Sequence, residues 1–188
     1  MFYLVVILCG MLTISVFNAR YTSDSFLYTL LTPIILTISV VLIDGIVALI
    51  IRRLPQKYFD ESHKGFDASK NERSFYERIG IKFWKDYVLE LGGFTDFHKN
   101  KVSKPDSPLY LKRFILECNY GSMIHLVSAF VGFLIVFITP LSSWYQYALP
   151  VAVVNTILNL LPMFILRYNV PRLKKALVFA IRKEKMNK

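Results

Sequence analysis

Cysteine and charged residues are both scarce in this sequence of 188 residues. Only two cysteines are present, which excludes a small secreted domain held together by several disulfides. Charged residues make up 19% of the chain, whereas a soluble globular domain usually contains about 25%. Hydrophobic residues make up 54%, which excludes an intrinsically disordered chain. The composition therefore indicates an integral membrane protein with a modest polar portion.

Four long apolar runs account for most of the hydrophobic residues. They cover residues 1–17, 26–51, 114–139 and 147–166. A helix needs about 17–25 apolar residues to cross the bilayer core, so we predict an all-α integral membrane protein with four transmembrane helices. An alternative for the first run is a cleavable signal peptide. That run lacks a positively charged start, and residues 18–20 do not form a small-x-small cleavage site, so we interpret it as a spanning helix.

Lysine and arginine are concentrated in two of the polar segments. The short connections 18–25 and 140–146 contain only Arg20 between them, whereas the segment 52–113 and the tail after Leu166 contain the other basic residues. The positive-inside rule therefore predicts a multi-pass protein of the cell membrane with both termini in the cytoplasm. On this interpretation the net charge of +10 reflects topology and affinity for anionic lipid, not binding to nucleic acid.

These features divide the chain into four parts. We predict two N-terminal transmembrane helices in residues 1–51, a cytoplasmic or interfacial segment in 52–113, two further transmembrane helices in 114–171 and a basic amphipathic tail in 172–188. Pro171 is expected to end the last transmembrane helix, because proline lacks the N–H that continues helical hydrogen bonding. The tail would then form a separate helix on the inner leaflet.

An amphipathic pattern in the second part predicts an interfacial helix between Glu72 and Leu91. Apolar residues recur there at near-helical spacing, at Phe75, Ile79, Phe83 and Val88. Further aromatic residues and two lysines flank this row. Such a pattern is typical of a helix that lies in the lipid headgroup layer. The alternative is a small helix that packs over the loop.

Three polar residues lie within or beside the apolar runs, where an unpaired acid costs about 2.5–3.5 kcal/mol on membrane-insertion scales. Asp44 is a candidate catalytic carboxylate. Its alternative role is that of a structural tether, paired with Arg52, Arg53 or His125. His125 is predicted to be a general base, because histidine titrates in the right range to take a proton from a hydroxyl; the alternative is a hydrogen bond between helices. Glu117 lies eight positions before His125, which fits no metal motif, so we predict no metal and treat Glu117 as a candidate to orient the histidine.

The fourth run ends in the segment Arg167-Tyr168-Asn169-Val170-Pro171-Arg172-Leu173. Arginine side chains near the start of a helix bind phosphate well. Arg167, Asn169 and Arg172 are therefore candidates to hold the phosphates of a donor or of a lipid headgroup. The alternative is ordinary anchoring of a helix end by positive charge.

Cys118, beside Glu117, is a further candidate as an acyl-accepting nucleophile. Most cysteines in membrane helices are inert apolar fillers, and we favour that interpretation. The sequence contains no serine-centred nucleophile elbow, no phosphate-binding glycine loop and no H-x-x-x-x-D acyltransferase box.

Three segments form a recognisable series along the chain. They are Ile81–Asp86 followed by Leu89–Phe94, then Glu117–His125 (ECNYGSMIH), and finally Asn159–Pro162 leading into Arg167–Leu173. Over residues 75–175 they resemble the glycosyl-4,4′-diaponeurosporenoate acyltransferase family. The resemblance implies transfer of a fatty acyl group to a sugar hydroxyl on a membrane-resident carotenoid glycoside. It also implies site residues at the matched positions, which are Trp84, Lys85, Asp86, Glu117, His125, Asn159, Arg167, Tyr168, Asn169, Pro171 and Arg172.

The leading hypothesis is a membrane-bound acyltransferase, or a related lipid-modifying enzyme, that works at the inner leaflet. In this hypothesis His125 is the general base and Glu117 or Asp44 orients or charges it. Substrate binding is assigned to Trp84, Lys85, Asp86, Asn159, Arg167, Tyr168, Asn169 and Arg172. No cofactor is expected, and acyl-CoA or another acyl donor is a substrate. The expected partners are the donor and a membrane lipid, and the small size is consistent with a homodimer or a larger membrane complex.

Two other functions compete with this hypothesis. The first is a non-catalytic membrane subunit that binds lipid or stabilises a larger complex. It is motivated by the small size and by departures from the family pattern at Tyr120, Ser122 and Leu166. The second is a small transporter or channel, which we disfavour because the polar residues cluster toward the predicted cytoplasmic side.

Overall fold

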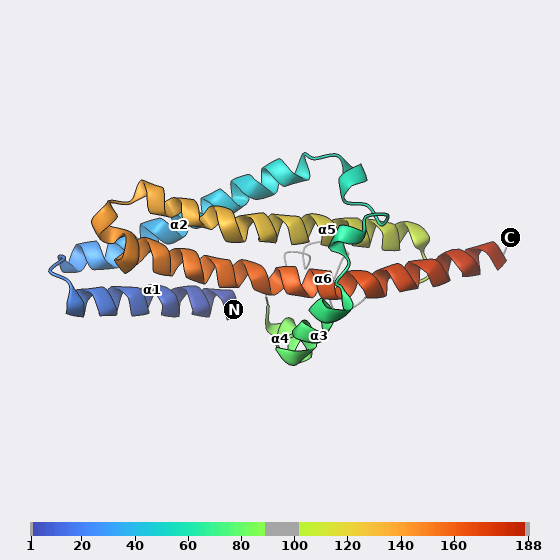
Figure 1. Cartoon of the computed structure of the whole chain (residues 1–188), viewed down its shortest axis with the longest axis horizontal. Helices are drawn as coiled ribbons and strands as arrows, with labels where there is room; N and C mark the ends of the chain where they lie inside the picture. Colours follow the sequence, from blue (N-terminus) through green and yellow to red (C-terminus); the bar gives the residue numbers. More distant parts are fainter. Residues whose placement is uncertain (1, 89–101, 187–188) are drawn as a thin grey trace. The chain divides into compact units, whose positions relative to one another are not determined.

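The computed structural model describes residues 2–88 and 102–186, with side chains from residue 4 onward, and all regular elements in these residues are helical (Figure 1). In chain order they are α1 (Phe2–Tyr21), α2 (Phe26–Arg52), η1 (Gln56–Tyr58), η2 (Lys64–Phe66), α3 (Lys70–Arg78), α4 (Ile81–Trp84), η3 (Lys85–Tyr87), α5 (Pro108–Val131), η5 (Gly132–Ile138), η6 (Leu141–Ser143), η7 (Trp144–Ala148) and α6 (Leu149–Met186). The prediction of an all-α chain is therefore confirmed for the described residues.

Four helical stretches of the described chain are long and apolar enough to cross a membrane, as predicted. They are Leu4–Tyr21, Phe26–Arg52, Pro108–Ile138 and Leu141–Met186. The third begins earlier than its apolar run, which we placed from residue 114. Ser107 accounts for this start, because its hydroxyl accepts a hydrogen bond from the Tyr110 backbone N–H (3.3 Å) and proline suits the first helical position.

Helix α6 continues through both Pro162 and Pro171, so the prediction of a helix end at Pro171 is wrong. The residues around Pro171 are held by packing, since Val170 and Leu173 are buried in a cluster with side chains of α5. This burial offsets the hydrogen bond that proline removes. The predicted separate tail helix is therefore the last part of α6, and Leu173, Leu177 and Ala180 on it pack into the core of unit 2.

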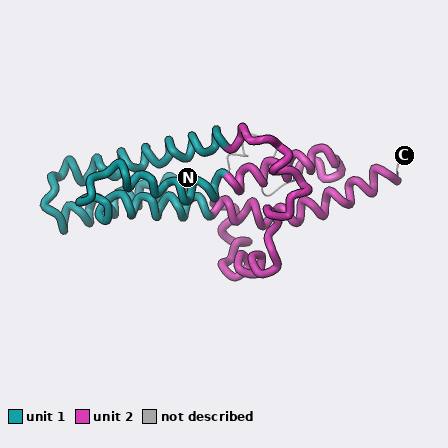
Figure 2. The backbone as a smooth tube through the Cα atoms, turned by 45° about the horizontal axis from the view of Figure 1, so that its top comes forward, with its two compact units in different colours: residues 1–50, 124–160 teal, residues 51–123, 161–188 magenta. Residues whose placement is uncertain are grey.

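The chain divides into two compact units (Figure 2). Unit 1 consists of Met1–Ile50 and Ile124–Leu160, and unit 2 consists of Ile51–Met123 and Leu161–Lys188. Helices α2, α5 and α6 each contribute residues to both units.

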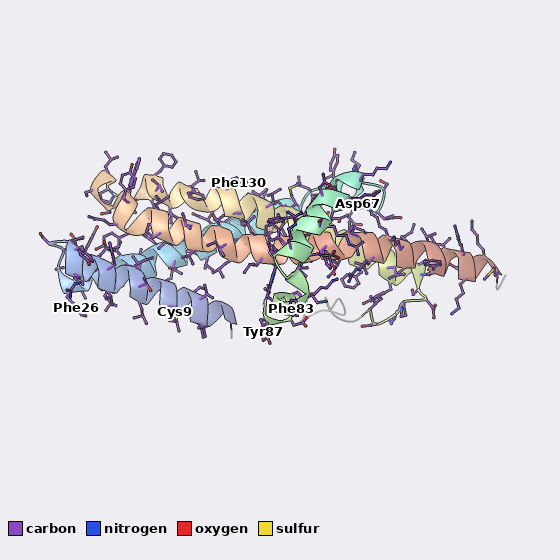
Figure 3. All side chains as sticks on the ribbon, turned by 60° about the horizontal axis from the view of Figure 1, so that its bottom comes forward. Cys9, Phe26, Asp67, Phe83, Tyr87 and Phe130 are labelled. Carbon is purple, nitrogen blue, oxygen red and sulfur yellow. The ribbon has the colours of Figure 1, made fainter. Side chains whose placement is uncertain are left out.

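Unit 1 has an apolar core made by α2, η5, η7 and the start of α6. Its members are Leu36, Val40, Ile135, Tyr147, Ala148, Val151 and Ala152. Two hydrogen bonds link the end of α1 and the loop after it to η7. Tyr147 Oη donates to Asp24 (2.9 Å), and Asn18 Nδ2 donates to the Gln146 carbonyl (2.8 Å). The outer faces carry large apolar side chains such as Phe26 and Phe130, as expected for helices that face lipid (Figure 3).

Unit 2 has a second apolar core between α5 and the C-terminal part of α6. Its members are Tyr110, Leu111, Phe114, Ile115, Cys118, Val170, Leu173, Leu177 and Ala180. The two helices approach closely at Gly121, where an added Cβ would lie 2.8 Å from Leu166 Cδ1. The segment after α2 is tied to α5 by two buried hydrogen bonds. Asn119 Nδ2 donates to the Phe59 carbonyl (2.7 Å), and Tyr120 Oη donates to the Leu54 carbonyl (2.7 Å).

The single helix predicted from Glu72 to Leu91 is wrong, because its described residues form three short pieces: α3, α4 and η3. Helix α3 starts at Ser69, which forms a capping box with Glu72. It ends before Gly80, whose φ of 71° lies in the left-handed region that favours glycine. The end of the predicted helix, residues 89–91, lies outside the described residues.

The apolar row on these pieces is exposed, and it differs from the predicted row by one residue. Val88 is buried, and Tyr87 takes its place in a row of exposed side chains, which we call the exposed row: Phe75, Ile79, Phe83 and Tyr87. Phe83 is 83% exposed and Tyr87 is 71% exposed (Figure 3). Tyr76 and Ile81 are the buried residues that hold α3 and α4 to the rest of unit 2. Helix α3 is thus a short helix packed on unit 2 through Tyr76, as in the alternative of a small packed helix, while much of the row stays exposed.

Candidate functional site

A histidine, an asparagine and an aspartate lie together in unit 1. His125 Nδ1 and Asn159 Oδ1 are 2.9 Å apart, and Asn159 Nδ2 donates to Asp44 Oδ2, also at 2.9 Å. The three side chains come from α5, α6 and α2, which brings together positions 34 and 115 residues apart in sequence. Asp44 is therefore paired with Asn159, which was not among the partners expected from the sequence.

The hydrogen bonds of Asn159 determine which nitrogen of His125 carries a proton. Asn159 Nδ2 has acceptors on two sides, since it donates to Asp44 and also lies 3.1 Å from Asn155 Oδ1. The Asn159 oxygen therefore faces His125 and needs a donor, which is the Nδ1–H of the ring. Nε2 is left with its lone pair, and among the described residues it has no hydrogen-bond partner. This is the tautomer that a histidine base requires.

Further polar atoms without partners gather at the same place. Asp44 Oδ1, Ser128 Oγ and Asn155 Nδ2 are buried and make no hydrogen bond within the described part of the chain. Ser128 and Asn155 both face the Asp44 carboxylate, so the three groups form one polar cluster. Asn155 also packs against Gly132, where an added Cβ would lie 2.5 Å from Asn155 Nδ2. Buried polar atoms without partners are uncommon and suggest a site for a polar ligand group or water.

Glu117 lies in unit 2, where it binds two arginines. Its Oε2 accepts from Arg52 Nη1 at 2.8 Å, and its Oε1 accepts from Arg113 Nη2 at 2.8 Å. The structure thus brings Glu117 together with arginines from α2 and α5 and gives His125 an amide partner instead.

All three nitrogens of Arg167 donate hydrogen bonds within unit 2. Its Nε and Nη2 bind the two carboxylate oxygens of Glu72 at 2.5 and 3.0 Å, and its Nη1 donates to the Gly65 carbonyl at 3.0 Å. Tyr76 Oη also donates to Glu72. The bound Arg167 lowers the pKa of Glu72, whereas burial raises the pKa of the Tyr76 hydroxyl. The ion pair of Arg167 with Glu72 therefore links α6 to α3.

Tyr168 and Arg172 form a second polar chain in the same unit. Tyr168 is buried and donates to Glu77 Oε1 at 3.0 Å, and Arg172 Nη2 donates to the Tyr168 oxygen at 2.9 Å. The Arg172 guanidinium also lies 4.6 Å from the centre of the Tyr168 ring. Arg172 is exposed and Asn169 is half-buried beside it on α6, and within the described residues the Asn169 side chain makes no hydrogen bond, so both are placed to meet a ligand.

The first motif segment forms α4 and η3. Trp84 Nε1 donates to the Ile79 carbonyl at 2.9 Å, which closes the turn around Gly80. Lys85 is half-buried and Asp86 is exposed in η3. The rest of this motif, Leu89–Phe94, lies outside the described residues.

Cys118 is buried in the apolar core of unit 2, as expected of an inert filler. Sequence reasoning missed three residues that the site uses: Glu72, Ser128 and Asn155. Two of them carried a signal, since Ser69 and Glu72 have the spacing of a capping box and Asn155 lies one helical turn before Asn159. Ser128 had none. The described residues contain no group of three or more His, Cys, Asp or Glu side chains placed to hold a metal ion.

Comparison with known families agrees with the resemblance noted in the sequence. The family model described as glycosyl-4,4′-diaponeurosporenoate acyltransferase matches residues 55–178. Neither a curated protein nor a solved structure matches the chain. The matched region contains the His125–Asn159 pair and the bound Arg167, and it spans more than half of the sequence. The chain therefore belongs to the glycosyl-4,4′-diaponeurosporenoate acyltransferase family.

Proposed function

We propose that this protein is a membrane acyltransferase that moves a fatty acyl group from a thioester donor such as acyl-CoA to a hydroxyl of a membrane lipid or glycolipid. The observation that carries the proposal is the 2.9 Å hydrogen bond between His125 and Asn159. It leaves His125 Nε2 as a base in an apolar unit, where few other groups can accept a proton. Membership of the family supports acyl transfer as the reaction and a carotenoid glycoside as one acceptor to test.

The proposed reaction needs one base and one leaving group. The acceptor hydroxyl gives its proton to His125 Nε2 while its oxygen attacks the carbonyl carbon of the thioester. The new C–O bond forms, the C–S bond breaks, and the departing thiolate takes the proton back from the imidazolium. Asn159 holds the ring through Nδ1, and Asp44, bound to the Asn159 amide, favours the transient positive charge on the ring.

The role of the arginines is narrower than the sequence indicated. Arg167 is occupied by Glu72 and a backbone carbonyl, so we assign it to positioning α3. Binding of a phosphate is assigned instead to Arg172 and Asn169, which keep polar atoms free. Glu117 is assigned to neutralising its two arginines.

The exposed row supports an interfacial position for α3 and α4. Large apolar or aromatic side chains that are partly or mostly exposed suit the headgroup layer of a bilayer, and the exposed Arg78 and Lys82 beside them suit anionic lipid. The lysine and arginine distribution favours the inner leaflet, with both termini in the cytoplasm.

A thiol-release assay on detergent-purified protein tests the proposal. The assay contains a long-chain acyl-CoA and either a carotenoid glycoside or a total lipid extract from the native host. We expect CoA release with a matching acylated lipid by mass spectrometry, and a loss of about 10²–10⁴-fold in rate in His125→Ala. The matched control is His63→Ala, because His63 is exposed in a loop of unit 2.

Equal rates in folded wild type and His125→Ala would contradict the assignment of the base. No release from any acceptor, together with a stoichiometric protein that co-purifies, would favour the non-catalytic membrane subunit instead.

A further inference from the structure

A cluster of charged side chains in unit 2 centres on Glu77. The Glu77 Oε1 atom lies 3.6 Å from Arg73 Nε and 3.7 Å from Lys82 Nζ. The same oxygen accepts a hydrogen bond from the Tyr168 hydroxyl at 3.0 Å, and that hydroxyl accepts one from Arg172 Nη2 at 2.9 Å. Three cationic side chains, from α3, α4 and α6, therefore gather around one carboxylate oxygen.

A buried aromatic ring helps to position this cluster. Tyr168 is only 2% exposed, and the guanidinium carbons of Arg73 and Arg172 lie over its ring, 5.6 and 4.6 Å from the centre. A guanidinium group is attracted to the electron-rich face of an aromatic ring at such distances. The ring and the Glu77 carboxylate thus hold the arginines together, which distinguishes the cluster from scattered surface charge.

The cluster carries more uncompensated positive charge than any other ion-pair group among the described residues. Three cations gather around one carboxylate, which leaves a surplus of two positive charges. The hydrogen bond from Tyr168 lowers the pKa of Glu77, so this carboxylate is charged at neutral pH. Glu117 has two arginines, a surplus of one. The other ion pairs have no surplus, and their carboxylates are Glu61, Asp67, Glu72 and Asp106.

The three cations also have N–H groups to offer to a ligand. The contacts of Arg73 and Lys82 with Glu77 are longer than a hydrogen bond, and the two side chains are 40% and 61% exposed. Among the described residues, Arg172 uses one N–H, for the Tyr168 hydroxyl. Phosphate oxygens form strong, charge-assisted hydrogen bonds with such donors.

We propose that Arg73, Lys82 and Arg172 together bind a phosphate monoester, whose charge of about −1.5 to −2 at pH 7 matches the surplus of the cluster. This assignment adds Arg73 and Lys82 to the phosphate site of the proposed function and rests on it for Arg172. Two sources supply such a group at a membrane surface: the 3′-phosphate of a CoA donor and the headgroup of phosphatidic acid.

The experiment measures binding to the full-length protein in phosphatidylcholine nanodiscs, with no acyl transfer. Calorimetry compares CoA with 3′-dephospho-CoA, which lacks the monoester. Native mass spectrometry compares the retention of phosphatidic acid with that of phosphatidylglycerol, which carries a phosphodiester. We expect a preference of about tenfold or more for the monoester in at least one comparison, because the lost hydrogen bonds are charge-assisted.

Variants then test which side chains carry the preference. Arg73→Gln combined with Lys82→Gln should abolish it. The matched control is Lys57→Gln combined with Lys64→Gln, which removes the same charge from two exposed lysines elsewhere in unit 2 and should keep the preference. The wild-type comparison tests the site even if the Arg73 and Lys82 variant fails to fold.

The outcomes separate the phosphate site from the reaction. A preference for CoA assigns the site to the donor, whereas a preference for phosphatidic acid assigns it to a lipid. No preference in either comparison, a preference that survives in the Arg73 and Lys82 variant, or an equal loss in the control would overturn the proposal. His125→Ala should keep the preference while losing CoA release from palmitoyl-CoA. A cluster-dependent preference in a wild-type protein that releases no CoA would uphold the phosphate site and overturn the acyltransferase.

Discussion

In unit 1 a histidine, an asparagine and an aspartate are connected through an amide, whereas in unit 2 carboxylates bind arginines directly. In the arginine pairs of unit 2 both charged partners are engaged, and all three nitrogens of Arg167 donate to Glu72 or to the Gly65 carbonyl. The site of unit 1 leaves Nε2 of His125 and three buried polar atoms without partners in the described residues. The difference teaches that charged residues need not mark the reactive site. In this protein the less charged unit carries the atoms that are free to react.

Beyond His125→Ala itself, the largest expected effect is that of Asn159→Leu. It removes the acceptor that orients His125 and the donor to Asp44, so we expect turnover to fall by about 10² or more. Because the two residues act as one unit, Asn159→Leu combined with His125→Ala should be no slower than His125→Ala alone. Turnover, measured as CoA release, is compared among the single and double variants. Additive losses in the double variant would show that the two residues act independently.

A second prediction concerns the ion pair of unit 2. Glu72→Ala leaves the Arg167 guanidinium, which is only 20% exposed, without its carboxylate, so we expect a loss of about 1–3 kcal/mol in stability. Unfolding in detergent measures the loss. Asp106→Ala is the matched control, because the Asp106–Lys183 pair is exposed and should contribute about 0–1 kcal/mol. If Glu72→Ala lost turnover without losing stability, Arg167 would be a substrate-binding residue. The contrast between a reactive unit 1 and a structural ion pair in unit 2 would then be wrong.

The two carboxylates that the sequence offered as partners of His125 should behave differently. Asp44→Asn removes the negative charge that Asn159 Nδ2 donates to, so we expect slower turnover than in wild type. Glu117→Gln weakens contacts with two half-exposed arginines, so we expect a stability loss of about 1 kcal/mol and little change in turnover. Turnover rates and unfolding curves of the two variants, measured under the same conditions, test this. A slower rate in Glu117→Gln than in Asp44→Asn would mean that Glu117 acts in the reaction.

The smallest expected effect is a change in how stability depends on pH. The folded pKa of Glu72 is lowered from the ordinary value of 4.5 by its bond to Arg167. Its contribution is therefore fully present above about pH 4.5 and is lost as pH falls through the folded pKa. The stability gap between wild type and Glu72→Gln should be constant from pH 7 to pH 5 and should shrink below pH 4.5. Unfolding temperatures across this range check it, and a gap that stays constant would mean that the bond does not depend on the Glu72 charge.

Parts of the site could be predicted from single positions, and parts could not. His125 and Asp44 stand out because charged or titratable residues are costly within apolar runs. Asn159 was chosen from the family pattern as a substrate-binding residue, and its place between the other two was not visible in the sequence. The engagement of Arg167 was hidden for the same reason, since its partner Glu72 lies 95 residues earlier.

The fold was predictable where local composition decides it. The sequence alone determined four helices long and apolar enough to cross a membrane, because the length of an apolar run sets whether a helix can cross the bilayer. The sequence also carried the family pattern. Only the tertiary structure decided that α6 continues through Pro171, that the exposed row is left uncovered, and that an amide joins His125 to Asp44. These outcomes depend on which distant residues pack together, because burial and hydrogen bonds between helices outweigh the local preference of a single residue.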